Sequence, residues 1–230
     1  MTTLMKNIFK HEHDKNKWDV VCKDLHTALY GFCTEAAETF SRAYENESEF
    51  FKRVIGLYTM HTIHDIVDHN EVKLFEEANN VLKDKSSKPY NPSGSDLALG
   101  LYVLVLDLIL TFWTELKCIH DLTYRGVGID VTSQYKIGTH IMFTSLVSSS
   151  KCKSIASRFA VGGTLFIIDN SGDSPMRPRE ITSYSSFSVE KECVYPLGTE
   201  FKVTNVNTNT KEVSLKLLSE TPFKSRHKLA

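Results

Sequence analysis

The 230-residue sequence contains few of the residues that define several specialised classes of protein. Its 5 cysteines are an odd number with no C-x-x-C pair, so cysteine spacing predicts neither a zinc site nor a disulfide scaffold. Reduced thiols in an intracellular protein are the simplest interpretation, although a trimmed secreted protein would look the same. The 11 glycines exclude a collagen-like repeat.

The sequence also has no apolar run long enough for an ordinary membrane span. The longest run, residues 97–113, contains Asp107 and is shorter than the roughly 20 residues that a bilayer requires. We therefore expect a buried helix there. Residues 1–18 are polar and lack the apolar core of a signal peptide, and residues 223–230 are basic without a lipid-anchor tail. An intracellular location, or delivery as an effector without a cleaved signal peptide, is favoured over an extracellular one.

The charges nearly balance, because 27 basic and 28 acidic residues give a net charge of −1. This balance argues against a general nucleic-acid-binding protein, so we expect no nucleic-acid partner. In contrast, 13 Phe, 9 Tyr and 2 Trp are too many for a disordered chain. The composition is typical of a folded globular protein, which we expect to be a monomer.

The pattern of apolar residues changes near residue 120. Before it, apolar residues recur at helical spacing, as at Phe50, Val54 and Leu57. After it, short runs read as strands at residues 122–127, 137–146, 163–169, 191–195, 200–206 and 213–218, with one helix at 151–160. The sequence thus predicts an α+β fold, in which a helical region (1–120) precedes a β-rich core (121–230). We expect the two regions to form one domain.

Two motifs offer other functions. His61, His64 and Asp68 would share one face of a helix and suggest a metal-dependent hydrolase, but no second ligand cluster completes the shell, so we expect no metal. Gly126-Val-Gly128 begins like a dinucleotide-binding fingerprint, but it lacks the third glycine and the helix that should follow.

Three separated features carry a stronger signal. Arg125 stands within an apolar strand, where a guanidinium needs an anionic partner. Phe143-Thr144-Ser145 ends a second predicted strand and is followed by further hydroxyl residues. Glu190 and Glu192 open a third strand, where their spacing would place both carboxylates on one face. Each feature alone has an ordinary structural explanation, but their order and spacing together favour a catalytic site.

This arrangement resembles the arginine-specific mono-ADP-ribosyltransferases, which have an Arg, Ser, Glu triad. The resemblance covers roughly residues 95–206. It rests on Tyr124-Arg125-Gly126, Phe143-Thr144-Ser145, residues 163–168, and the run Ile181-Thr-Ser-Tyr184-Ser185, Glu190-Lys191-Glu192 and Pro196. The second hydroxyl that the family has after the serine is replaced here by Leu146 and Val147, although Ser148 to Ser150 follow. The cysteine pairs of its secreted vertebrate members are not reproduced.

The resemblance implies a helical half packed on a two-sheet β core with an NAD cleft, and cleavage of NAD with transfer of ADP-ribose to an arginine of an acceptor protein. It implies no metal. Arg125 would hold an NAD phosphate or ribose, and Ser145 would hold Glu192, which would stabilise the ribosyl cation. Glu190 would bind the acceptor guanidinium. Contacts with NAD would come from Tyr124, Arg125, Gly126, Phe143, Ser145 and Glu192, and a substrate loop would contain Tyr184, Phe187 and Glu190.

Other functions stay open at this stage. The same fold could mainly hydrolyse NAD or transfer ADP-ribose to a residue other than arginine, which would make Glu190 less important. A protein of another class, either a non-catalytic binding protein or the His/Asp metal hydrolase, is the remaining alternative.

Overall fold

The computed structural model describes residues 47–59, 63–64, 71–72, 79, 102–107, 109–111 and 113–218. The chain divides into two compact units. The first comprises Met1–Trp113 together with Tyr184–Phe187, and the second comprises Thr114–Ser183 and Ser188–Ala230. Whether these units act as one domain, as the sequence predicts, stays a prediction.

Most described residues of the first unit are helical. Helix α4 (Glu47–Thr59) buries Phe51, Val54 and Tyr58 on one face, as the helical spacing predicts. Residues 102–107 and 109–111 are also helical, and the Tyr102 hydroxyl donates a hydrogen bond to the Val54 carbonyl at 2.6 Å. Among the residues described, no helix is both long and apolar enough to cross a membrane.

The His/Asp motif does not lie on a continuous helix. Residues Ile63–His64 form strand β1, which pairs antiparallel with β2 (Glu71–Val72). The prediction that His61, His64 and Asp68 share a helix face is therefore wrong at His64, because side chains of a strand alternate with a period of two. His61 and Asp68 themselves lie outside the described residues.

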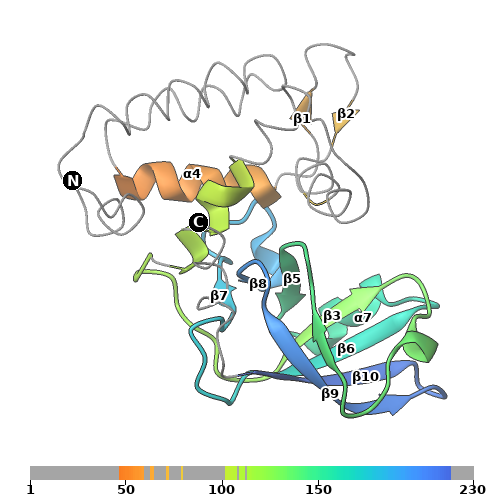
Figure 1. The fold of residues 1–230 in the computed structure, drawn as a ribbon. Helices are drawn as coiled ribbons and strands as arrows, with labels where there is room; N and C mark the ends of the chain where they lie inside the picture. Colours follow the sequence, from red (N-terminus) through yellow and green to blue (C-terminus); the bar gives the residue numbers. More distant parts are fainter. Residues whose placement is uncertain are drawn as a thin grey trace, which may run out of the picture. The chain divides into compact units, whose positions relative to one another are not determined.

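The second unit is built on a β-sheet (Figure 1). Its strands are β3 (Thr123–Val127), β4 (His140–Met142), β5 (Val147–Ser150), β6 (Thr164–Asp169), β7 (Arg179–Glu180), β8 (Glu192–Tyr195), β9 (Glu200–Asn207) and β10 (Glu212–Leu217). They are hydrogen-bonded in the order β4-β9-β10-β6-β3-β5-β8-β7, and only β10 and β6 pair in parallel. The α+β class is confirmed.

The sheet is continuous, in contrast to the two sheets that the resemblance implies. However, β3 and β5 share a single registered pair, Tyr124 with Ser150, whereas β3 and β6 pair along all five residues of β3. The sheet therefore consists of a five-stranded part and a three-stranded part, joined by one narrow connection between β3 and β5.

Two short strands were missed from the sequence. Strand β5 falls in the serine run that we assigned to a strand end, and β7 lies in a segment rich in proline and charge. Serine has a low strand propensity, so β5 forms a strand because of its tertiary context: it pairs with β8 along all four of its residues. The predicted strand at 137–146 shrinks to three residues, β4.

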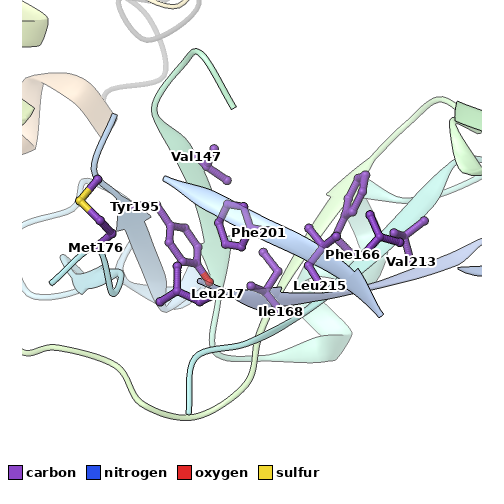
Figure 2. Packing of buried hydrophobic residues seen from close by; sticks show 10 residues of the cluster. Val147, Phe166, Ile168, Met176, Tyr195, Phe201, Val213, Leu215 and Leu217 are labelled. Carbon is purple, nitrogen blue, oxygen red and sulfur yellow. The ribbon is translucent and has the colours of Figure 1, made fainter. Parts of the chain in front are cut away.

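The core of the second unit lies on one face of the sheet (Figure 2). Alternate residues of five strands supply it, because successive side chains of a strand point to opposite faces. They are Val147, Phe166, Ile168, Tyr195, Phe201, Val203, Val213, Leu215 and Leu217, with Met176 from a loop. The ring of Phe201 packs edge-on against that of Tyr195, with centroids 5.2 Å apart. Val147 and Tyr195 thus anchor β5 and β8 in this core.

Helix α7 (Lys153–Phe159) packs against β3 at a glycine. A Cβ atom on Gly126 would lie 2.0 Å from the Ala156 carbonyl oxygen and 2.6 Å from the Ala160 nitrogen. Only glycine permits this approach of helix to strand.

Candidate active site

A carboxylate and a serine meet at adjacent strands of the second unit. Glu192 begins β8 and lies opposite Ser150 of β5 in the strand register. The hydroxyl that reaches it comes from the diagonal neighbour, since Ser148 Oγ donates a hydrogen bond to Glu192 Oε1 at 2.5 Å. Two antiparallel strands thus fix the separation of the two groups.

The Glu192 carboxyl has a pKa raised from its ordinary value of 4.5 to about 7. Burial is the main cause, and the nearby charge of Glu190 raises the pKa further. The hydrogen bond from Ser148 and the charge of Arg125 act in the opposite direction. A strongly shifted carboxyl with these partners marks a functional site more often than a structural one.

Arg125, on β3, is hydrogen-bonded to β5. Its Nη1 donates a hydrogen bond to the Ser148 carbonyl oxygen at 2.7 Å. This bond crosses the connection between β3 and β5, where the strands share one registered pair. The guanidinium therefore holds the backbone of the residue whose hydroxyl binds Glu192, and its positive charge favours the ionised form of that carboxyl.

Glu190 lies in a turn rather than on the strand. It ends the 3₁₀ helix η2 (Ser188–Glu190), and Lys191 follows with a φ of 50°. The prediction that Glu190 and Glu192 project from one strand is wrong, because the left-handed Lys191 interrupts the extended backbone. The two carboxylates are nevertheless close enough for the charge of Glu190 to raise the pKa of Glu192.

A buried polar cluster lies among the strands that carry these groups. The Tyr195 hydroxyl donates to Asn170 Oδ1 at 2.8 Å and lies 2.6 Å from Thr123 Oγ1. Asn170 Nδ2 donates to the Asp121 carbonyl at 2.7 Å. Burial raises the pKa of the Tyr195 phenol, so it stays protonated. The cluster ties β8 to β3 and to the loop after β6.

Ser145 is not hydrogen-bonded to Glu192 in the structure, and its catalytic role stays a prediction. It lies in a bend between β4 and β5, and among the described residues its hydroxyl has no hydrogen-bond partner, whereas Ser148 binds Glu192. The aromatic-x-Ser pattern led to Ser145 because β5 was not recognised. The run of hydroxyls at Ser148–Ser150 was the available signal, since it supplies a serine three residues later.

Two predicted NAD contacts have structural roles. The ring of Phe143 packs against Phe201 and Phe166, with centroids 5.7 Å and 6.3 Å apart, and its contact with NAD stays a prediction. Gly126 makes room for α7, and its contact with NAD stays a prediction. Tyr124 lies on β3 between Ile167 and Ser150 and stays a predicted contact.

The predicted substrate loop is divided between the units. Residues Tyr184–Phe187 belong to the first unit, where the Tyr184 ring stacks at a tilt on Trp113 with centroids 5.2 Å apart. The Ser186 nitrogen donates to Thr59 Oγ1 at 2.9 Å. Tyr184 thus packs within its unit, whereas Phe187 is 37% exposed. Glu190 belongs to the second unit, and Val189 beside it is 76% exposed.

Comparisons with known proteins point to one family. A family model described as NAD:arginine ADP-ribosyltransferase matches residues 54–225. No curated protein sequence matches the chain significantly.

Several solved structures share the fold at low identity. HopU1, an ADP-ribosyltransferase of Pseudomonas syringae, is 17% identical with a TM-score of 0.63, over 90% of this chain and 99% of its own. The eukaryotic mono-ADP-ribosyltransferase ART2.2 is 17% identical with a TM-score of 0.61, over 92% of this chain and 90% of its own. Vis, from Vibrio splendidus, in complex with agmatine is 14% identical with a TM-score of 0.55, over 94% of this chain and 90% of its own. With the family model matching most of its length, the chain belongs to the NAD:arginine ADP-ribosyltransferase family.

Proposed function

We propose that this protein is a mono-ADP-ribosyltransferase that cleaves the nicotinamide–ribose bond of NAD and transfers ADP-ribose to an arginine of an acceptor protein. The observation that carries the proposal is the Glu192 carboxyl, which is bound by Ser148, flanked by Arg125 and Glu190, and shifted in pKa to about 7. Family membership and the fold support it.

Glu192 supplies the main electrostatic stabilisation. As nicotinamide leaves with the bonding electron pair, positive charge develops on the ribose, as in glycoside hydrolysis. An ionised Glu192 accepts a hydrogen bond from a ribose hydroxyl and stabilises this cation. The fixed hydrogen bond from Ser148 holds the carboxylate in place before the reaction, so little reorganisation is needed.

Arg125 binds the anionic part of NAD. Its guanidinium offers five donors in a planar fork, which suits a phosphate. The hydrogen bond from Nη1 to the Ser148 carbonyl fixes the Arg125 side chain against β5. Phosphate binding and the orientation of Glu192 therefore depend on the same strand, β5.

Glu190 serves the acceptor. Its carboxylate binds the acceptor guanidinium and takes a proton as the nitrogen attacks the ribose carbon. An arginine has a pKa above about 12, so proton loss must accompany attack. The side chain of Val189, which precedes Glu190 and is 76% exposed, offers apolar surface to an acceptor.

The acceptor class is tested with a small guanidine and with proteins. We expect the purified protein to release nicotinamide from NAD and to label agmatine, and to label arginine residues in a cell lysate by mass spectrometry. Labelling of cysteine, asparagine or glutamate instead would contradict arginine specificity, and nicotinamide release without any labelled acceptor would favour NAD hydrolysis. Delivery of the protein as an effector stays a prediction.

A further inference from the structure

The turn between the two glutamates is held by the end of strand β5. Ser150 is buried, with 6% of its surface exposed, and its hydroxyl donates to the Glu190 carbonyl oxygen at 2.7 Å. The same hydroxyl accepts a hydrogen bond from the Cys152 nitrogen at 3.0 Å. A buried hydroxyl with both functions satisfied holds its partners in a defined place.

The residue that follows β5, Lys151, holds the next carbonyl of the turn. The Lys151 nitrogen donates to the Lys191 carbonyl oxygen at 3.2 Å, and the Lys191 nitrogen donates to the Ser188 carbonyl oxygen at 3.2 Å. Consecutive carbonyls at Glu190 and Lys191 therefore both bind the end of one strand.

The turn adopts a backbone conformation that needs this support. Lys191 has a φ of 50°, in the left-handed region that residues other than glycine rarely adopt. Such a conformation costs on the order of 1 kcal/mol and persists where surrounding bonds determine it. Lys191 lies between the end of η2 and the start of β8, so its backbone conformation determines the position of Glu190 relative to Glu192.

We propose that Ser150 and the left-handed Lys191 form a clamp that positions the Glu190 carboxylate beside Glu192, and that this clamp determines how well the enzyme uses an acceptor other than water. This inference rests on the proposed function. Ser150 and Lys191 are positioning residues, because they act through the backbone of Glu190. Loosening the clamp leaves Glu192 held by Ser148 but lets Glu190 move away.

The proximity of the two carboxylates can be measured without any reaction. Glu190 and Arg125 are the charged groups that act on Glu192, whereas Lys151, which follows β5, and Glu180 of β7 form an ion pair with each other. The Glu192 carboxyl is titrated by carbon NMR, with its signal assigned from Glu192→Gln. Replacing Glu190 by Gln should lower the pKa of Glu192, and the size of this decrease reports the proximity of the two groups.

Matched variants separate the clamp from general damage to the fold. Ser149→Ala is the control for Ser150→Ala, because Ser149 is a neighbour that is also 6% exposed, but its hydroxyl binds the Cys193 carbonyl. Lys191→Gly and Lys191→Ile both remove the charge, but only glycine accepts the left-handed backbone without strain. Ser150→Thr keeps the hydroxyl.

We expect the effect of Glu190→Gln on the Glu192 pKa to fall to about half or less in Ser150→Ala and Lys191→Ile, because Coulomb energy decreases with separation. It should persist in Ser149→Ala, Lys191→Gly and Ser150→Thr. In Ser150→Ala and Lys191→Ile, transfer to agmatine should fall by about tenfold or more relative to NAD hydrolysis.

An undiminished effect of Glu190→Gln in Ser150→Ala would overturn the clamp. So would an equal loss of the effect in Ser149→Ala or in Lys191→Gly. A wild-type protein that neither hydrolyses NAD nor modifies agmatine would instead overturn the proposed function, whatever the NMR titration shows.

Discussion

At the scale of single residues, the site depends on a carboxylate whose charge is costly in the folded protein. Glu192 has its pKa raised to about 7 mainly by burial, yet the proposed chemistry requires the ionised form. Ser148 and Arg125 reduce that cost by favouring the charge. In the proposed mechanism, the negative charge of Glu192 stabilises the developing ribosyl cation and is formed at the expense of stability.

Replacing the carboxylate should remove both reactions. In Glu192→Gln we expect transfer and NAD hydrolysis to fall together by about 10²–10³, because both pass through the same ribosyl cation. Nicotinamide release and agmatine labelling are measured side by side, with Glu212→Gln as the control, since that glutamate pairs with Lys153 at the surface. Near-normal hydrolysis in Glu192→Gln would remove Glu192 from this role.

The same substitution should stabilise the protein at neutral pH. Because the folded pKa of Glu192 is raised above 4.5 to about 7, wild-type stability falls as pH rises between these values. Relative to Glu192→Gln, the loss should approach about 3 kcal/mol above pH 7. Chemical unfolding of both proteins from pH 4 to 8 measures this difference, and a constant difference would contradict the shifted pKa.

Ser148 and Ser145 should differ sharply. Ser148→Ala removes the hydrogen bond to the ionised Glu192, so the pKa of that carboxyl should rise further. The increase of kcat/KM with pH should then occur at a higher pH. Ser145→Ala should retain activity and its pH profile, because Ser145 lies in a bend away from this hydrogen bond. A pH–rate profile of each variant measures this difference. Loss of activity in Ser145→Ala alone would restore the prediction made from the sequence.

Only part of the site was predictable from local patterns. Arg125, Glu190 and Glu192 follow from motifs with fixed spacing, but the turn at Glu190 does not. A spacing of two residues predicts a shared face only where the backbone is extended, and Lys191 is left-handed. Ser148 could not be separated from Ser145, because the choice depends on which strand pairs with β8.

At the scale of elements, the position of β3 depends on close packing with α7. The long strands were predictable from their alternating apolar residues. Strand β5 was not, because its residues Ser148, Ser149 and Ser150 have little intrinsic strand preference and form a strand by pairing with β8. The single registered pair between β3 and β5 is a long-range property with no local signature.

Gly126 tests the packing of α7 on β3. A methyl group at this position would lie 2.0 Å from the Ala156 carbonyl oxygen, whereas one at Gly128 would meet its nearest atom at 3.9 Å. We expect Gly126→Ala to lower the free energy of unfolding by about 3 kcal/mol or more and Gly128→Ala to have little effect. Urea unfolding of both variants measures this, and equal stabilities would contradict the packing.

At the scale of the whole molecule, the sequence predicted the change from helices to strands but not how the strands join. Periodicity reports which residues face a core, and it does not report partners. The second unit places Arg125, Ser148 and Glu192 on β3, β5 and β8, three strands that are consecutive in the sheet. The sheet order thus brings together residues that are distant in the sequence.

The central claim is that the two carboxylates have different tasks, with Glu192 serving NAD and Glu190 serving the acceptor. Glu190→Gln should abolish transfer to a guanidine and spare much of the NAD hydrolysis, because water needs less help to attack than a protonated guanidinium. The most direct measurement is the ratio of agmatine ADP-ribosylation to nicotinamide release in wild type and Glu190→Gln. We predict a large fall in this ratio, and an unchanged ratio would contradict the account.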